Sequence, residues 1–178
     1  MPDAPCRRAG GSANTLSPRA CRPEQHPPMS YSCAELAKMI DHSLLHPTLT
    51  DAELEEGCRL AARYAVASVC IKPYAVRQAV EWLRGSGVLV GCVVGFPHGN
   101  SLTEVKRYET ELACRDGATE IDMVINVGAL KSKDYVTVKE DIAAVVRAAH
   151  AGNALVKVII EATLLTDEEK VIASHLSK

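Results

Sequence analysis

The sequence lacks the short motifs that mark several large classes of enzyme. Its 178 residues hold no G-x-G-x-x-G, no G-x-x-x-x-G-K-[ST] and no G-x-S-x-G, so dinucleotide-binding, P-loop and serine-hydrolase sites lack their basic parts. The six histidines form no H-E-x-x-H or similar ligand spacing, and we expect neither a metal nor another cofactor. The longest apolar runs, such as VLVGCVVGF, are too short to cross a bilayer.

Paired cysteines and a strong charge of one sign are also absent. The seven cysteines are odd in number and none have C-x-x-C spacing, which argues against a disulfide framework and favours a reducing, cytoplasmic location. The formal net charge is −2, from 20 basic and 22 acidic residues. This balance predicts neither a nucleic-acid partner nor a membrane partner.

The beginning of the chain differs in composition from the rest. Residues 1–28 hold most of the prolines and show no apolar periodicity, which predicts a disordered N-terminal extension. Met29 would be a sensible true start, and an organelle transit peptide is the alternative use of this segment. The folded domain is expected over residues 29–178, an ordinary size for one domain.

From Cys33 onward, short apolar runs alternate with amphipathic helical stretches. The runs lie at residues 38–45, 67–73, 88–97, 119–127 and 154–162. Their hydrophobicity is continuous rather than alternating, which is typical of parallel strands covered on both faces. The pattern predicts five βα units and hence an α/β fold with a parallel sheet.

Predicted helix starts support this division. Four sequences of the form S/T-x-x-E follow strand runs and match the capping box, in which two side chains satisfy free backbone N–H groups. They are Thr50 with Glu53, Ser101 with Glu104, Thr137 with Glu140, and Thr166 with Glu169.

Polar residues interrupt the apolar runs or follow them directly. They are Asp41, Ser43, Cys70, Lys72, Pro97 to Asn100, Asp122, Asn126, Lys157 and Glu161. The carboxyl ends of parallel strands converge at one face, where active sites lie in such folds. Taken singly, each residue also has a structural explanation: Cys70 as core filler, for example, or Asp122 and Lys157 as a structural ion pair.

Asp122 and Lys157 each have apolar neighbours on both sides. Burial among such neighbours would lower the pKa of Lys157 and leave more free amine, as a Schiff-base nucleophile needs. A nearby Asp122 could relay protons. The residues alone therefore predict imine or proton-transfer chemistry on a small carbonyl compound.

Five segments together resemble deoxyribose-phosphate aldolase. They are MIDHSLLHPTLT, ASVCIKP, VGFPHGN, EIDMVINVGALKSKDY and VKVIIEATLLTDEEK, in this order, and the resemblance covers about residues 36–178. It implies a TIM barrel and a metal-free lyase of deoxyribonucleotide catabolism in the cytoplasm. The implied reaction cleaves 2-deoxy-D-ribose 5-phosphate reversibly to D-glyceraldehyde 3-phosphate and acetaldehyde through a lysine Schiff base. The partners implied are this phosphorylated sugar and, because the family commonly forms dimers, a second copy of the chain.

The resemblance also implies roles for particular residues. Asp122 matches the family's proton-relay aspartate. The substrate-pocket and supporting residues implied are Lys157, Cys70, Asp41, Ser43 and Asn126. Ser43 replaces the threonine common at that position but keeps the hydroxyl. Lys157 matches a lysine that points to the site without forming the Schiff base, so an electrostatic role replaces the nucleophilic one.

The sequence departs from the family in one respect. The family's Schiff-base lysine lies on the sixth strand in a motif like KTSTGF, and this sequence has no such motif. Five βα units cannot close a barrel, so we expect a truncated, partial barrel that is not an efficient aldolase by itself.

Two other interpretations remain open. A flavodoxin-like open sheet could bind a phosphorylated ligand or a protein without catalysis, although the first strand has only Asp41 where a Mg²⁺-dependent phospho-receiver needs an acidic pair. A degenerate remnant without function would expose apolar surface.

Overall fold

The computed structural model describes residues 31–178, which form an α/β unit, so the predicted disorder of residues 1–28 lies outside the described part. Its single sheet contains five parallel strands in chain order. They are β1 (Asp41–Leu44), β2 (Ser68–Ile71), β3 (Leu89–Val94), β4 (Glu120–Val124) and β5 (Leu155–Ile159). Each lies inside one of the five predicted apolar runs, which confirms the strand predictions.

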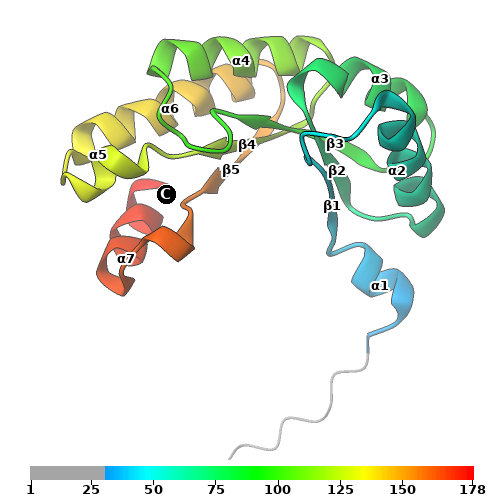
Figure 1. The fold of residues 1–178 in the computed structure, drawn as a ribbon, viewed down its shortest axis with the longest axis horizontal. Coiled ribbons are helices and arrows are strands. Elements are labelled where there is room, and N and C mark those ends of the chain that lie inside the picture. The colour runs from blue at the N-terminus through cyan, green and yellow to red at the C-terminus, as the bar shows by residue number, and fades with distance from the viewer. Residues whose placement is uncertain (1–30) are drawn as a thin grey trace, which may run out of the picture. The chain divides into compact units, whose positions relative to one another are not determined.

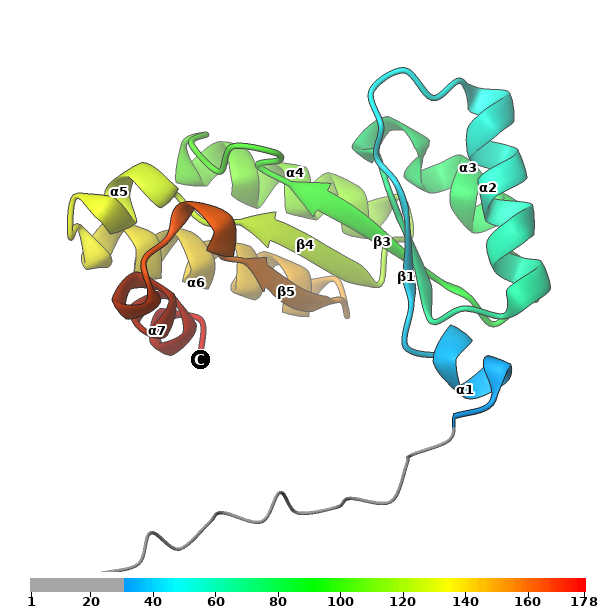
Figure 2. The same ribbon diagram turned by 60° about the horizontal axis from the view of Figure 1, so that its bottom comes forward.

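Helices connect the strands and cover one face of the sheet. They are α1 (Cys33–Ala37), α2 (Asp51–Tyr64), α3 (Val76–Trp82), α4 (Thr103–Arg115), α5 (Val127–Lys131), α6 (Tyr135–Ala151) and α7 (Asp167–Leu176), with short 3₁₀ turns at Pro73–Ala75 and Ala162–Leu164. Figure 1 shows α2, α3, α4 and α6 along the outer side of the curved sheet, above and to the right of the strands, and Figure 2 shows the opposite face without a helical layer. None of the helices in residues 31–178 combines the length and apolar character needed to cross a membrane.

The core lies between the sheet and these helices. Along each strand, side chains point alternately toward the helices (outward) and toward the open face (inward), so every second side chain packs against a helix. The fully buried members include Val69, Ile71, Cys92, Ile121 and Met123 from strands, and Leu54, Cys58, Val138 and Val145 from helices. Burial of each of the Val, Ile, Leu and Met side chains among them stabilises the fold by about 1.5–3 kcal/mol through the hydrophobic effect.

Two of the predicted capping boxes form. The Thr50 and Thr166 hydroxyls accept hydrogen bonds from the N–H groups of Glu53 and Glu169, and each glutamate side chain returns to the backbone of its cap residue. A third box, between Ser32 and Glu35 at the start of α1, was not predicted.

The other two predicted boxes are wrong. Helix α4 begins after Leu102 without a side-chain cap, so Ser101 lies outside it. Helix α6 begins at Tyr135, because Asp134 takes the cap position and accepts hydrogen bonds from the backbone and hydroxyl of Thr137. Aspartate is at least as good an N-cap as threonine, so the earlier residue sets the start.

The two edge strands are less covered than the central strands. All four residues of β2 are buried, whereas none in β5 is buried, because β5 pairs only with β4. In a flavodoxin-like sheet the first strand lies between the second and third, and helices cover both faces. Here β1 lies at the edge beside β2, so the flavodoxin-like interpretation is wrong.

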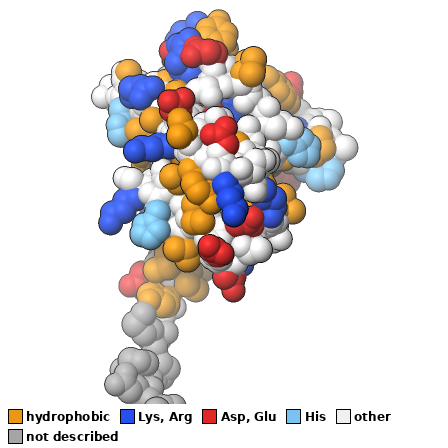
Figure 3. Space-filling view, turned by 90° about the vertical axis from the view of Figure 1, so that its left-hand side faces the viewer, with side chains coloured by type: hydrophobic (Ala, Val, Ile, Leu, Met, Phe, Trp, Pro, Cys, Tyr) orange, Lys and Arg blue, Asp and Glu red, His pale blue; other side chains and the backbone are white. Residues whose placement is uncertain are grey.

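The surface at one end of this unit carries charges of both signs. Figure 3 shows lysine and arginine side chains interspersed with aspartate, glutamate and apolar groups on the side of α5 and α7. The pair Lys131–Glu169, 3.0 Å apart, joins these two helices. This face therefore has no field of a single sign, consistent with the small net charge.

Candidate active site

Inward-facing side chains of the strands meet on the uncovered face of the sheet. The pairing register places Asp41 opposite Ser68, and Asp122 opposite Lys157. Strand side chains alternate between faces, so Cys70 and Glu120, two residues along from Ser68 and Asp122, share this face. Residues from four strands are thus gathered by the parallel register alone.

An ionic cluster forms where these side chains converge. The Lys157 Nζ lies 2.6 Å from Asp41 Oδ2, 2.9 Å from Glu120 Oε2 and 3.1 Å from Asp122 Oδ1. The side chains of Glu120 and Asp122 are 10% and 13% exposed, whereas those of Lys157 and Asp41 are 35% and 44% exposed. The cluster therefore has a buried acidic side and a side open to solvent.

The pKa of Lys157 is raised, not lowered. Partial burial alone would lower the pKa of this ammonium, but its contacts with Asp41, Glu120 and Asp122 outweigh that effect. The expectation that apolar neighbours in sequence would favour the free amine is therefore wrong. Those neighbours are adjacent along β5, whereas the groups that face Nζ come from β1 and β4.

Cys70 and Asp122 are joined by a hydrogen bond. The Cys70 thiol donates to Asp122 Oδ2 over 3.1 Å. Burial raises the pKa of Cys70, and the neighbouring charge of Asp122 raises it further, so this cysteine remains a thiol. One carboxylate oxygen of Asp122 thus faces Cys70, while the other faces Lys157.

Asp41 is fixed at the outer side of the cluster. The Ser68 hydroxyl donates to Asp41 Oδ1 over 2.7 Å, and Lys157 donates to Oδ2. The hydrogen bonds from Lys157 and then Ser68 lower the pKa of Asp41, so it is a carboxylate at neutral pH. A carboxylate pair and an ammonium held within hydrogen-bonding distance can move protons at a bound carbonyl compound.

A family model for DeoC/LacD family aldolases matches residues 35–174. The chain belongs to this aldolase family. It is 51% identical over 144 residues to the deoxyribose-phosphate aldolase of Clostridium tetani, covering 81% of this chain and 66% of that protein. The corresponding protein of Brevibacillus brevis is 53% identical over 140 residues, covering 79% of this chain and 62% of the relative.

Solved aldolase structures share the fold. A structure described as a putative deoxyribose-phosphate aldolase from Coccidioides immitis is 38% identical, with a TM-score of 0.80 over 84% of this chain and 58% of that one. The tetrameric deoxyribose phosphate aldolase of Aeropyrum pernix is 30% identical, with a TM-score of 0.76 over 82% and 61% of the two chains. This chain spans less than two thirds of the length of each of these four relatives.

Family membership confirms the predicted class and fold. The five βα units are a partial TIM barrel, and the aldolase relatives are carbon–carbon lyases. A parallel sheet that does not close on itself leaves one face open, and its two edge strands, β1 and β5, each pair with a single neighbour.

Two residues implied by the aldolase resemblance lie outside the ionic cluster. Ser43 is exposed on β1 opposite Cys70 in the register. Asn126 follows β4 and caps α5, where its Oδ1 accepts a hydrogen bond from the Ala129 N–H over 3.0 Å. The structure therefore gives Asn126 a local structural contact.

The polar residues nominated at other strand ends are also apart from the cluster. Lys72 donates to the Leu49 carbonyl over 3.0 Å, and Glu161 accepts from Thr163. His98 and Asn100 are exposed in the connection after β3.

Three charged residues were missed by sequence reasoning. Glu120 was absent from the predicted site, although its position two residues before Asp122 places both on one strand face. Lys106 of α4 and Asp141 of α6 form a buried ion pair 2.5 Å long, with side chains 0% and 2% exposed. Lys106 also donates to the carbonyls of Gly99 and Val124, over 2.6 and 2.9 Å.

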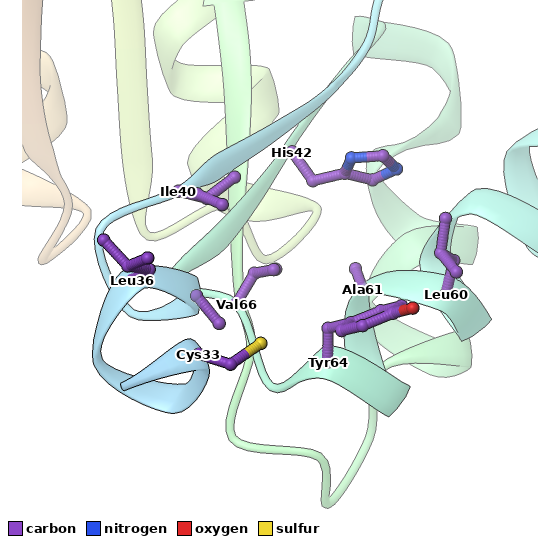
Figure 4. Close-up of a pocket in the computed structure, with 9 residues that line it drawn as sticks. Cys33, Leu36, Ile40, His42, Leu60, Ala61, Tyr64 and Val66 are labelled. Atoms are coloured by element: carbon purple, nitrogen blue, oxygen red, sulfur yellow. The ribbon is translucent and has the colours of Figure 1, made fainter. Parts of the chain in front are cut away.

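A separate apolar pocket lies on the helix-covered side of β1. Its volume is about 240 Å³, and Figure 4 shows side chains from α1, β1 and α2 around it. His42, Leu60 and Tyr64 border the pocket, and none of the ionic-cluster residues does. The outward side of an edge strand is covered by one helix rather than two, which leaves this space.

Proposed function

We propose that this chain provides five βα units of a deoxyribose-phosphate aldolase. The reaction is the reversible cleavage of 2-deoxy-D-ribose 5-phosphate into D-glyceraldehyde 3-phosphate and acetaldehyde, in deoxyribonucleotide catabolism. The observation that carries the proposal is the convergence of Asp41, Asp122 and Lys157 on the open face, in a chain about half identical to aldolases.

Asp122 is the proposed proton donor and acceptor. Its carboxylate is mostly buried, contacts an ammonium on one side and accepts from the Cys70 thiol on the other, which fixes its orientation. A carboxylate held in this way can pass a proton to and from a substrate or water during imine formation and enamine protonation.

Lys157 has an electrostatic role in this proposal. Its raised pKa keeps it an ammonium, which stabilises the negative charge of Asp122 and of oxyanions that develop nearby. The imine-forming lysine is expected on a strand beyond these five, in the KTSTGF-like motif that this sequence does not contain.

A hollow beside the cluster is suited to a small phosphorylated sugar. It measures about 370 Å³, and its lining includes the apolar Val93 and Phe96 and one charged residue of each sign, Lys72 and Glu109, but no residue of the ionic cluster. Val93 is the register partner of Asp122, so the hollow adjoins the proposed proton-transfer residue. Enzyme pockets for small ligands combine apolar walls with a few polar groups in this way.

Location and assembly complete the proposal. Five cysteines among residues 31–178 are unpaired thiols, which supports a reducing cytoplasm. Self-association as a homodimer is the proposed assembly, in keeping with the tetramer formed by the Aeropyrum pernix relative.

A chimera tests whether these five units carry aldolase machinery. The 144 aligned residues of the Clostridium tetani relative are replaced by those of this chain, and cleavage of 2-deoxy-D-ribose 5-phosphate is measured. We expect the chimera to be active, the 178-residue chain alone to be far slower, and Asp122→Asn in the chimera to lower kcat by about 10²–10⁴-fold.

Asp167→Asn is the matched control, because Asp167 is 99% exposed at the start of α7. It should leave kcat unchanged. A folded chimera without activity, or one in which Asp122→Asn behaves like Asp167→Asn, contradicts the proposal.

A further inference from the structure

Glu120 contributes a third carboxylate at the buried side of the cluster. It lies on β4 with its side chain 10% exposed, and Gly91 is its cross-strand neighbour. A Cβ at Gly91 would lie 3.7 Å from Glu120 Oε2, an ordinary contact, so the Glu120 carboxylate lies directly above this glycine of β3. The Glu120 Oε2 lies 2.9 Å from Lys157 Nζ.

We propose that Glu120 holds Lys157 as a cation and thereby prevents it from acting as an imine-forming amine. Glu120 is a positioning residue in this view, since it acts through Lys157. The inference deepens the proposed aldolase function, because it explains why a lysine at the centre of the site leaves imine formation to another amine.

The geometry distinguishes Glu120 from the other acids around Lys157. Asp41 of β1 is 44% exposed, so water and salt weaken its attraction for the ammonium. Asp122 of β4 shares its charge with the thiol of Cys70 on β2. Glu120 is the most buried of the three carboxylates, at 10% exposed against 13% for Asp122, so solvent screens its charge least. Its distance from Lys157 Nζ, 2.9 Å, lies between the 2.6 Å of Asp41 and the 3.1 Å of Asp122.

Lys157 would otherwise suit imine chemistry. Its side chain is 35% exposed on the open face, so solvent and small solutes reach this side of the cluster. An ammonium has no free electron pair on nitrogen and cannot attack a carbonyl carbon. Removal of the Glu120 charge shifts the equilibrium toward the neutral amine, and because Asp41 and Asp122 still contact Nζ, the effect is a larger fraction of nucleophilic amine rather than a fully free one.

The expected reaction can be trapped chemically. The Lys157 amine adds to the carbonyl carbon of acetaldehyde, forming a C–N bond, and the carbinolamine loses water to give the imine. Borohydride then delivers hydride to the imine carbon, and water supplies a proton to nitrogen. The stable product is N-ethyl-lysine, which peptide mass spectrometry locates by residue.

The experiment compares the 178-residue chain with its Glu120→Gln variant, which keeps the side-chain shape and removes the charge. Both are treated with acetaldehyde and borohydride at about pH 8, below the ordinary lysine pKa of about 10.4. We expect ethylation of Lys157 to rise about ten-fold in the variant, as follows from a fall of about one unit in its pKa. Exposed Lys139 is the internal reference, and its ethylation should not change.

Glu111→Gln is the matched control, because Glu111 pairs with Arg107 on exposed α4. It should leave Lys157 labelling at the parent level. Equal Lys157 ethylation in Glu120→Gln and the parent, with unchanged circular dichroism, overturns the proposal.

A second measurement needs no variant. Acetic anhydride labels free amines, and the labelling of Lys157 relative to Lys139 is followed with rising pH in the parent chain. The proposal requires Lys157 to react at higher pH than Lys139, and equal midpoints overturn it. Neither labelling measurement depends on catalytic turnover. An inactive chimera would therefore contradict the aldolase proposal without contradicting the role of Glu120.

Discussion

Within residues 31–178, the lysine–carboxylate groups around Lys106 and around Lys157 differ in burial and in charge. Lys106 is fully buried and has one carboxylate, Asp141, with two backbone carbonyls as its further acceptors. Lys157 is one-third exposed and is surrounded by three carboxylates. The first group is electrically balanced and dry, whereas the second carries excess negative charge beside solvent.

The difference separates a structural role from a chemical one. Lys106 ties Gly99, in the connection after β3, to the end of β4 and to helix α6, and its three donors are all used. Both side chains are buried, at 0% and 2% exposed, so the pair offers no exposed side to a ligand. The Lys157 cluster keeps an exposed side on which a substrate can exchange protons with it.

The largest expected effect is at the buried pair. Lys106→Met leaves the Asp141 carboxylate buried without its partner, which should lower the free energy of unfolding by about 3–5 kcal/mol. Urea unfolding of the chain measures this change, with exposed Lys139→Met as a control expected within about 0.5 kcal/mol. Similar urea midpoints for Lys106→Met and Lys139→Met would show that the buried Lys106–Asp141 pair stabilises no more than an exposed lysine does, and would contradict its structural role.

Lys157→Met should cost less, about 1–2 kcal/mol at neutral pH, because solvent screens the exposed part of the cluster. The pKa of Lys157 is raised, so its contribution is fully present below the unfolded value of about 10.4 and is lost as pH rises through the folded value. The parent and variant should therefore converge in stability at strongly alkaline pH. A constant difference across that range would show that Lys157 stabilises by packing alone.

The smallest effect is expected at Asp41, where Asp41→Asn should cost less than about 1 kcal/mol because the side chain is largely exposed. The pKa of Asp41 is lowered, so its contribution is present above the unfolded value of about 3.9 and is lost as pH falls through the lower folded value. Acid unfolding should show the parent losing its small advantage over the variant below about pH 4. If Asp41→Asn lowered the free energy of unfolding as much as Lys106→Met does, both groups of charges would have a mainly structural role.

The strand positions were accessible from the sequence, and the local helix starts only in part. Continuous apolar runs locate the five parallel strands, and all five appear where expected. The coverage on both faces that these runs also predicted is wrong for the open face, and no residue of β5 is buried. The boxes at Thr50 and Thr166 form, while Asp134 displaces Thr137 as the cap because two capping residues compete within one turn.

The sequence predicted which residue types form the site, but not their charge interactions. Asp122 and Lys157 could be nominated because apolar neighbours make a charge conspicuous. The partner Asp41 lies 116 residues before Lys157, so the raised pKa depends on sheet curvature rather than on local sequence. Lys106 resembles any helix-surface lysine until the contact between α4 and α6 is known.

The bond between Asp41 and Lys157 joins the first strand of the sheet to the last. These strands have β2, β3 and β4 between them, yet the two side chains approach within 2.6 Å. The ion pair spans the concave side of the curved sheet, so the distance between its two atoms depends on how strongly the sheet is curved. Flattening the sheet would increase the distance between Asp41 and Lys157. This one distance therefore reports the curvature of the face that holds the proposed catalytic side chains.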